Sequence, residues 1–265
     1  MCKKAVVFDN SGTLTERYRV IKNIEKDKLF TDLSSQEIVM ASSSHAMVVL
    51  QFDSVDLCKI DPDYLISDYI KENSIDFDLS FSTSPIAKDK IKKVLENEKE
   101  ATVKDITDTF PLLKSKIPDF EICNGSALII DFEREKIIYT ITSAGKLFKR
   151  CISTVNTLKN NGFKIFIASG DRSGAVSKLT DLLEIPKENG FPTSSSYRKC
   201  EIVKKLQSEG YNVTMVGDGA NDIKAFKKSD ISILTLEQED KVSNVVLDKT
   251  DYVVNEISEI IEILI

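Results

Sequence analysis

Short apolar stretches alternate with helical patterns throughout the second half of the chain, from about residue 145 onward. The expected strands are residues 163–168, 213–216, 231–234 and 252–254. Strands and helices that alternate through short loops predict a parallel sheet with helices on both faces. An apolar run near the beginning, which ends abruptly at Asp9, is expected to join the same sheet. The sequence therefore predicts an α/β core of the Rossmann-like kind.

Residues 32–122 differ from this core in composition, because they are rich in serine and aspartate. Residues 46–52 and 77–81 are typical of strands, and two helical patterns accompany them. We expect a small α+β cap here, inserted after the first strand.

The core is then discontinuous, made of residues 1–31 and 123–265. Within it, residues 11–23 are predicted to form an extended flap beside the first strand, and residues 127–141 a hairpin that turns near Glu133.

Composition limits the possible partners of the chain. The 265 residues include 36 basic and 42 acidic side chains, and the basic ones form no patch, which argues against nucleic-acid binding. No apolar run is long enough to cross a membrane, and the N-terminus enters a predicted strand without a signal peptide. The cysteines are odd in number, widely spaced and expected to be reduced: Cys2, Cys58, Cys123, Cys151 and Cys200. We expect a cytoplasmic protein, with no membrane partner, that is a monomer.

Polar signatures follow three of the predicted parallel strands. Asp9 follows the first, Ser169-Gly170-Asp171 the second, and residues 217–222 (Gly-Asp-Gly-Ala-Asn-Asp) the third. Because the carboxyl ends of parallel strands meet at one edge of a sheet, these groups are expected to converge there.

Their chemistry suits phosphoryl transfer. Asp9 and Asp218 could share one Mg²⁺, a hard ion that prefers oxygen ligands. Ser169 and the amides after it could donate hydrogen bonds to a phosphate, and Lys199 could supply a positive charge. A nucleophile, a metal and cationic donors are the parts that in-line phosphoryl transfer requires.

These stretches resemble the four motifs of the haloacid-dehalogenase superfamily, and most closely the phosphorylation domain of P-type ATPases. The motif residues are Asp9-Asn10-Ser11-Gly12-Thr13-Leu14-Thr15, Ser169-Gly170-Asp171, Lys199 and Gly217-Asp218-Gly219-Ala220-Asn221-Asp222. The resemblance covers roughly residues 1–24 and 136–265.

The resemblance implies a role for each motif residue. Asp9 is the nucleophile that forms an aspartyl-phosphate. Asp9, Asp218 and the backbone carbonyl of Ser11 hold Mg²⁺, and Asp222 supports the metal or its waters. The phosphate-binding residues are Ser11, Ser169, Gly170, Lys199 and Asn221. Of these, Ser11 and Lys199 are also catalytic.

Simpler interpretations exist for several of these residues. Ser169 could cap the next helix, Lys199 could be solvated, and Asp222 could favour a helix dipole. Asp171 could only brace the loop that carries Ser169. His45, the one histidine, is expected to be a surface or packing residue.

The sequence departs from the family at Ser11, where most phosphatases of the superfamily have a second aspartate. A hydroxyl is a poor proton donor or acceptor at neutral pH, so the phosphoenzyme should break down slowly. The hypothesis that follows is a Mg²⁺-dependent phosphohydrolase acting on a small phosphorylated substrate or a nucleotide. The alternatives are a soluble ATPase or phosphotransferase whose insert binds ATP, and a phosphorylatable regulatory module.

Overall fold

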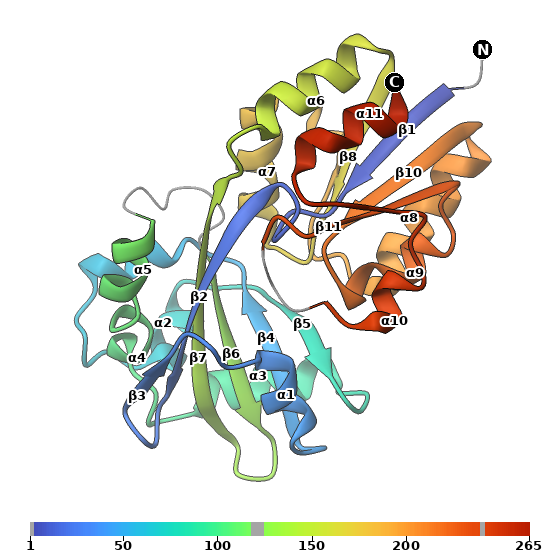
Figure 1. The fold of residues 1–265 in the computed structure, drawn as a ribbon. Helices are drawn as coiled ribbons and strands as arrows, with labels where there is room; N and C mark the ends of the chain where they lie inside the picture. The colour runs from blue at the N-terminus through green and yellow to red at the C-terminus, as the bar shows by residue number, and fades with distance from the viewer. Residues whose placement is uncertain (1–2, 118–124, 239–241) are drawn as a thin grey trace. The chain divides into compact units, whose positions relative to one another are not determined.

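The computed structural model describes residues 3–117, 125–238 and 242–265 (Figure 1). The chain divides into two units, which we call the core unit and the insert unit. The core unit comprises residues 1–17 and 145–265, and the insert unit comprises residues 18–144. Each unit has its own sheet.

The core unit is built on a six-stranded parallel sheet of order β12-β11-β10-β1-β8-β9. Its strands are β1 (Lys3–Phe8), β8 (Phe163–Ala168), β9 (Gly190–Phe191), β10 (Tyr211–Gly217), β11 (Ile231–Thr235) and β12 (Tyr252–Val254). Its helices are α6 (Cys151–Asn160), α7 (Ser173–Leu182), α8 (Ser196–Ser208), α9 (Ile223–Phe226), α10 (Asn244–Leu247) and α11 (Ile260–Leu264).

Strand β1 supplies side chains to both faces of this sheet. Val6 and Phe8 belong to the apolar cluster formed with α6, α7 and α11, whereas Ala5 and Val7 belong to the cluster formed with α8, α9 and α10. Successive side chains of a strand point to opposite faces, so a strand buried on both sides must be continuously apolar. This burial explains why the run before Asp9 does not alternate between polar and apolar residues.

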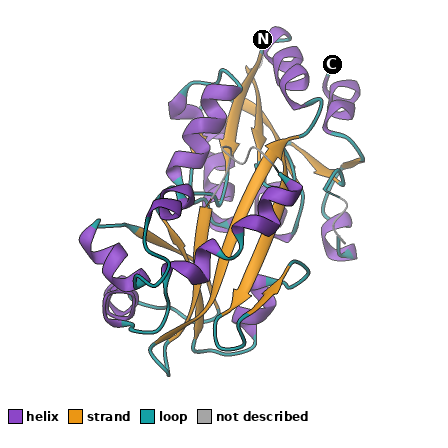
Figure 2. Cartoon of the chain, turned by 90° about the vertical axis from the view of Figure 1, so that its left-hand side faces the viewer, coloured by secondary structure: helices purple, strands orange, loops and turns teal. Residues whose placement is uncertain are grey.

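The insert unit contains an antiparallel sheet of order β3-β2-β7-β6-β4-β5, whose long strands are seen in Figure 2. Its strands are β2 (Thr15–Asn23), β3 (Lys28–Phe30), β4 (His45–Leu50), β5 (Phe77–Ser82), β6 (Gly125–Asp131) and β7 (Lys136–Leu147). Its helices are α1 (Ser35–Met40), α2 (Ile66–Glu72), α3 (Lys88–Asn97), α4 (Val103–Thr107) and α5 (Phe110–Lys116). Helices α2 to α5 contribute to the larger apolar cluster of this unit, and Val39 of α1 belongs to a second cluster.

The predicted α/β core with a parallel sheet is confirmed, and the strands at 163–168 and 252–254 have the predicted bounds. The hairpin also forms, with its turn between β6 and β7.

The division of the chain differs from the expected insert of residues 32–122, because the insert unit extends from residue 18 to residue 144. The segment expected to form a flap contains β2, which belongs to the insert sheet. The hairpin belongs to the same sheet, where its strand β6 pairs with β4. Composition located the serine-rich region, but it could not indicate which sheet the flanking strands would join.

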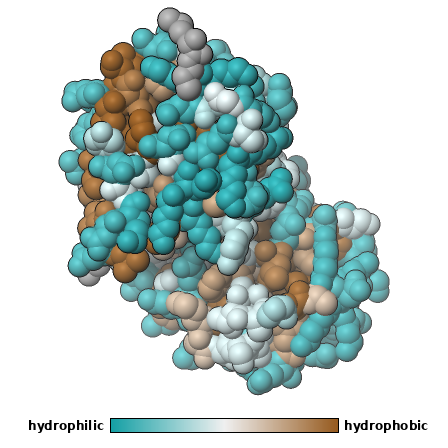
Figure 3. Space-filling model, turned by 90° about the vertical axis from the view of Figure 1, so that its right-hand side faces the viewer, coloured by the Kyte–Doolittle hydropathy of each residue, from teal (hydrophilic) through white to brown (hydrophobic). Residues whose placement is uncertain are grey.

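Three of the five cysteines lie in the described residues, and Cys58, Cys151 and Cys200 are free thiols. Cys2 and Cys123 lie outside the described residues. Of the helices that the structure describes, none has the length and apolar character that crossing a membrane requires. In the space-filling view, apolar residues form separate groups on a largely hydrophilic face (Figure 3).

Candidate active site

Asp9 directly follows β1, which lies between β8 and β10 in the core sheet. Its backbone N–H donates to the carbonyl of Val216 at 2.9 Å, so the sheet hydrogen bonding extends to this residue. The residue is only 2% exposed. Asp9 is therefore a buried carboxylate held by the central strand at the carboxyl edge of the sheet.

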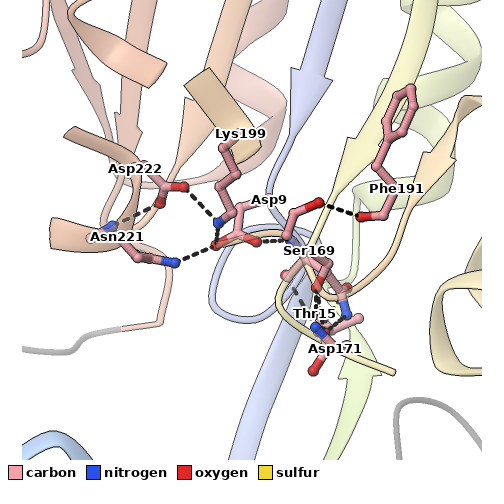
Figure 4. A network of polar contacts seen from close by, with 11 residues as sticks. Asp9, Thr15, Ser169, Asp171, Phe191, Lys199, Asn221 and Asp222 are labelled. Atoms are coloured by element: carbon pink, nitrogen blue, oxygen red, sulfur yellow. Dashed lines mark hydrogen bonds and ion pairs between the residues drawn. The ribbon is translucent and has the colours of Figure 1, made fainter. Parts of the chain in front are cut away.

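Lys199 reaches this carboxylate from α8. Its Nζ lies 2.8 Å from Asp9 Oδ2 and 2.7 Å from Asp222 Oδ1 (Figure 4). Lys199 shares the buried face of α8 with Ile202, Val203 and Leu206, at helical spacing. The apolar side chains of this face therefore fix the direction in which the lysine points.

Burial by itself would lower the pKa of Lys199, but the charges and hydrogen bonds of Asp222 and Asp9 outweigh it and raise the pKa. The ammonium therefore stays charged. The interpretation of Lys199 as a solvated helix residue does not hold, since its side chain is 1% exposed.

Asp218 and Asp222 complete a cluster of three carboxylates with Asp9. Each of the three offers one oxygen, and these oxygens all lie within 4.8 Å of one another. Burial, with the charges of neighbouring carboxylates, raises the pKa of both Asp218 and Asp222. The raised pKa values mean that Lys199 only partly offsets the negative charge that three ionised carboxylates would carry here.

Two glycines make this close approach possible. A Cβ on Gly12 would lie 2.1 Å from Asp218 Oδ2, and a Cβ on Gly217 would lie 2.4 Å from Asp222 Oδ2. Gly12 also has a φ of +83°, which other residues rarely adopt. Glycine is therefore required at both positions if the carboxylates are to stay where they lie.

The donor set fits Mg²⁺. Mg²⁺ prefers oxygen ligands and is commonly held by one or two carboxylates together with water and phosphate oxygens. A divalent cation would balance the charge of the three carboxylates in their ionised form, which Lys199 alone does not. Ser11, whose carbonyl is the fourth predicted ligand, is half-buried in the turn between Asp9 and Gly12.

Two asparagines also contact Asp9. Asn221 Nδ2 donates to Asp9 Oδ2 at 3.2 Å, and the backbone N–H of Asn10 donates to Asp9 Oδ1 at 2.8 Å. Both carboxylate oxygens of Asp9 are therefore oriented by donors.

Ser169 and Gly170 lie in the loop after β8, next to β1 in the sheet. Ser169 Oγ donates to Asp171 Oδ2 at 2.7 Å and accepts from the Asp171 N–H at 3.1 Å. Asp171 thus braces the loop. Ser169 does not cap α7, whose N-cap is Arg172.

The structure brings the predicted residues Asp9, Lys199, Asn221 and Asp222 into direct contact and Asp218 into the carboxylate cluster. His45 lies in the insert unit, half-buried, with Nδ1 3.0 Å from the Ile38 carbonyl. No role for Asn10 was predicted from the sequence, because the β1–β8 register that brings it level with the Ser169 loop is not a local feature; its place one residue after Asp9 was the available signal.

Sheet and site together define a class of α/β protein in which a buried aspartate and lysine meet at the carboxyl edge of a parallel sheet. A family model of the haloacid dehalogenase-like hydrolases matches residues 3–230. The chain therefore belongs to this family and is an enzyme of the hydrolase class.

Among known proteins, the chain is 36% identical over 262 residues to a soluble P-type ATPase-like phosphatase of Methanocaldococcus jannaschii, covering 98% of this chain and 93% of that protein. It is also 36% identical over 133 residues to a chloroplastic copper-transporting ATPase of Arabidopsis thaliana, covering 48% of this chain and 15% of the ATPase. Among solved structures, a phosphoserine phosphatase trapped as a phospho-aspartyl intermediate analogue superimposes with a TM-score of 0.48 and 17% identity, and the match covers 100% of both chains.

Proposed function

We propose that this protein is a Mg²⁺-dependent phosphatase that forms an aspartyl-phosphate on Asp9. The observation that carries the proposal is the buried Asp9 carboxylate, 2.8 Å from a buried lysine and within a cluster of three carboxylates. The similarity to a protein named as a phosphatase supports the same conclusion.

In the proposed first step, an Asp9 carboxylate oxygen attacks the phosphorus of a phosphate ester. The bond from phosphorus to the ester oxygen breaks, and the alcohol leaves with a proton from solvent. Lys199 and Asn221 hold Asp9 in place through Oδ2, and Ser169 with the Gly170 amide would hold the phosphate oxygens. Water then hydrolyses the acyl-phosphate and regenerates the Asp9 carboxylate.

The metal would be held by Asp9, Asp218 and the Ser11 carbonyl, with support from Asp222. When bound, Mg²⁺ offsets the repulsion between the carboxylates and the phosphate. The packing of Gly12 against Asp218 and of Gly217 against Asp222 keeps these oxygens close together in the protein itself.

We infer that the substrate is a small phosphate ester. A nucleotide substrate, or transfer of the phosphoryl group to an acceptor other than water, is the second candidate. The observation that favours this candidate is Ser11, which provides no carboxylate to activate water.

The first test is hydrolysis of p-nitrophenyl phosphate with and without Mg²⁺, comparing the wild type with Asp9→Asn. We expect hydrolysis that requires Mg²⁺ and is lost in Asp9→Asn, since an amide is not a nucleophile at this position. Asn212→Ala, an exposed change on β10 in the same unit, is the control and should retain full activity. Wild-type inactivity, or full activity of Asp9→Asn, would overturn the proposal; a phosphoenzyme formed from ATP would then favour the second candidate.

A further inference from the structure

Two hydrogen bonds converge on one oxygen of Asp171 from two different loops. Asn10 Nδ2 donates to Asp171 Oδ2 at 2.6 Å, and Ser169 Oγ donates to the same oxygen at 2.7 Å. Asp171 therefore joins the loop after β1, which carries Asp9, to the loop after β8, which carries Ser169.

The register of the core sheet explains this meeting. Strands β1 and β8 pair in parallel with Phe8 opposite Ile167, so Asn10 comes level with Ser169 two residues further along. The Asp9 carboxylate contacts the side chains of Lys199 and Asn221, whereas the Asn10 side chain contacts Asp171. Two consecutive residues thus reach different parts of the site.

The Asn10 side chain has a defined orientation. Thr15 Oγ1 lies 3.1 Å from Asn10 Oδ1 and donates to it, so the amide nitrogen is the atom that faces Asp171. A reversed amide would place an oxygen against the carboxylate. The residue is fully buried, and its carbonyl accepts the N–H groups of Thr13, Leu14 and Thr15.

The Asp171 loop is also fixed from its other side. The N–H of Thr193 donates to the Asp171 carbonyl at 2.9 Å, and the N–H of Ser194 donates to the Ser169 carbonyl at 2.7 Å. This second attachment keeps the loop in place when one of its side-chain hydrogen bonds changes.

A change of this kind is required if Ser169 binds phosphate. A serine hydroxyl has a single proton, and here that proton is donated to Asp171. When the proton turns to a phosphate oxygen, Asn10 Nδ2 is the donor to the Asp171 carboxylate that remains among the residues that the structure describes. A buried or half-buried acceptor without a donor is unfavourable, so Asn10 lowers the free energy of the phosphate-bound state.

We propose that Asn10 is a positioning residue for phosphate binding, acting through Asp171 on the Ser169 hydroxyl. The inference rests on the proposed function, since it takes Ser169 to be the phosphate-binding hydroxyl. Asn10 would then connect the loop after β1, which carries Asp9, to the loop after β8, which carries Ser169, and would act on phosphate binding through Asp171.

The test is a set of mutant cycles read out by binding of inorganic phosphate, measured by isothermal titration calorimetry at saturating Mg²⁺. Asn10→Ala should weaken phosphate binding about tenfold, the effect of losing one hydrogen bond to a charged group. The same change should have little further effect in Asp171→Ala or Ser169→Ala backgrounds, because the path through Asp171 is already broken. Asn212→Ala is the matched control and should bind phosphate as the wild type does.

A rescue experiment separates positioning from general disruption. Asn10→Asp places two carboxylates against each other and should weaken binding more than Asn10→Ala. Adding Asp171→Asn to Asn10→Asp restores one donor and one acceptor with the original total charge, so part of the affinity should return. If circular dichroism shows that Asn10→Ala does not fold, the comparison of Asn10→Asp with the double variant Asn10→Asp, Asp171→Asn tests the proposal in its place.

The outcomes distinguish the inference from the function on which it rests. If Ser169→Ala binds phosphate normally, the proposed phosphate site is wrong. If Ser169→Ala weakens binding but Asn10→Ala does not, or if the effect of Asn10→Ala persists in Asp171→Ala, the phosphate site stands and the positioning role of Asn10 is wrong.

Discussion

Lys199 is a buried cation whose contacts in the site are two carboxylates, those of Asp9 and Asp222. Lys199 lies on the buried, apolar face of α8, where its ammonium group loses its hydration. The pairing compensates for that loss, so the three side chains depend on one another for their charged states.

Replacing Lys199 by methionine should therefore lower the free energy of unfolding by about 3–5 kcal/mol, because two buried carboxylates lose their counter-ion. Urea denaturation at neutral pH measures the change. Lys205→Met, on the exposed side of the same helix, should change stability by less than about 0.5 kcal/mol. Equal effects of the two substitutions would contradict the assignment of Lys199.

In the proposed function, Ser11 determines a different property, the rate at which the phosphoenzyme breaks down. Ser11→Asp supplies a carboxylate that can accept a proton from water, and we expect the steady-state hydrolysis of p-nitrophenyl phosphate to rise at least about tenfold. Ser11→Asn, similar in size but without the carboxylate, is the control. An unchanged or slower rate in Ser11→Asp would mean that water attack does not limit turnover.

At the scale of single elements, the turn after β1 combines a positive φ with close packing. Gly12 and Gly162 have similar φ values, +83° and +80°, but a Cβ would meet Asp218 only at Gly12 and would meet nothing within 4 Å at Gly162. A comparison of substitutions at the two glycines therefore distinguishes the effect of backbone strain from the effect of contact with Asp218.

Gly162→Ala should destabilise the protein by about 1–2 kcal/mol through strain alone and leave hydrolysis intact. Gly12→Ala carries the same strain and also displaces Asp218, so it should abolish the response to Mg²⁺. Thermal unfolding and Mg²⁺ titration of hydrolysis measure the two effects. A Gly12→Ala variant with a normal Mg²⁺ response would show that Asp218 is not a ligand.

The hairpin of the insert unit depends on Asp131 at the end of β6. Burial opposes ionisation of Asp131, but hydrogen bonds from Ser44 Oγ and from the N–H groups of Glu133 and Arg134, with the charge of His45, outweigh it and hold the pKa below its usual value. A carboxylate whose pKa is lowered by folding stabilises the protein above its unfolded pKa of about 3.9, and the contribution is lost as pH falls through the folded pKa.

Asp131→Asn should therefore be less stable than the wild type at pH 7 by about 1 kcal/mol, and the difference should shrink as pH falls below about 4. Urea denaturation at several pH values measures it. Asp32→Asn, an exposed change in the same unit, is the control and should change the free energy of unfolding at pH 7 by less than about 0.5 kcal/mol. A difference that grows in acid would refute the assigned role of Asp131.

The parts of the fold and of the site that could be predicted from the sequence are those that depend on residues close together in the chain. Asp9, Lys199, Asp218, Asn221 and Asp222 were found from short motifs, because each motif ends a strand or opens a helix of recognisable pattern. The role of Asn10 depends on the register between β1 and β8, which pairs residues more than 150 positions apart. The same limit explains the insert boundary, since β2, β6 and β7 carry no local sign of the sheet they join.

At the scale of the whole molecule, the insert unit is one continuous segment whose two ends lie on neighbouring strands, β2 and β7. It has its own apolar clusters, formed by residues of this unit. Adjacent ends and a separate core are the features of a segment that can fold independently.

Residues 18–144 expressed alone should therefore unfold in urea with a single cooperative transition. Residues 32–122, the segment indicated by composition, lack β2, β6 and β7 and should give no such transition. Circular dichroism measures both. Equal behaviour of the two segments would contradict the division at residues 17/18 and 144/145.

The central position of β1 also has a consequence for the order of folding events. Strand β1 is near the beginning of the chain, but both strands that flank it, β8 and β10, follow the insert unit in sequence. Pairing between distant segments must close long loops and is intrinsically slow. During synthesis, β1, which leads directly into Asp9, therefore has no strand to pair with until β8 and β10 have been made. The insert unit is complete before then, and the site can form only after β10 has emerged.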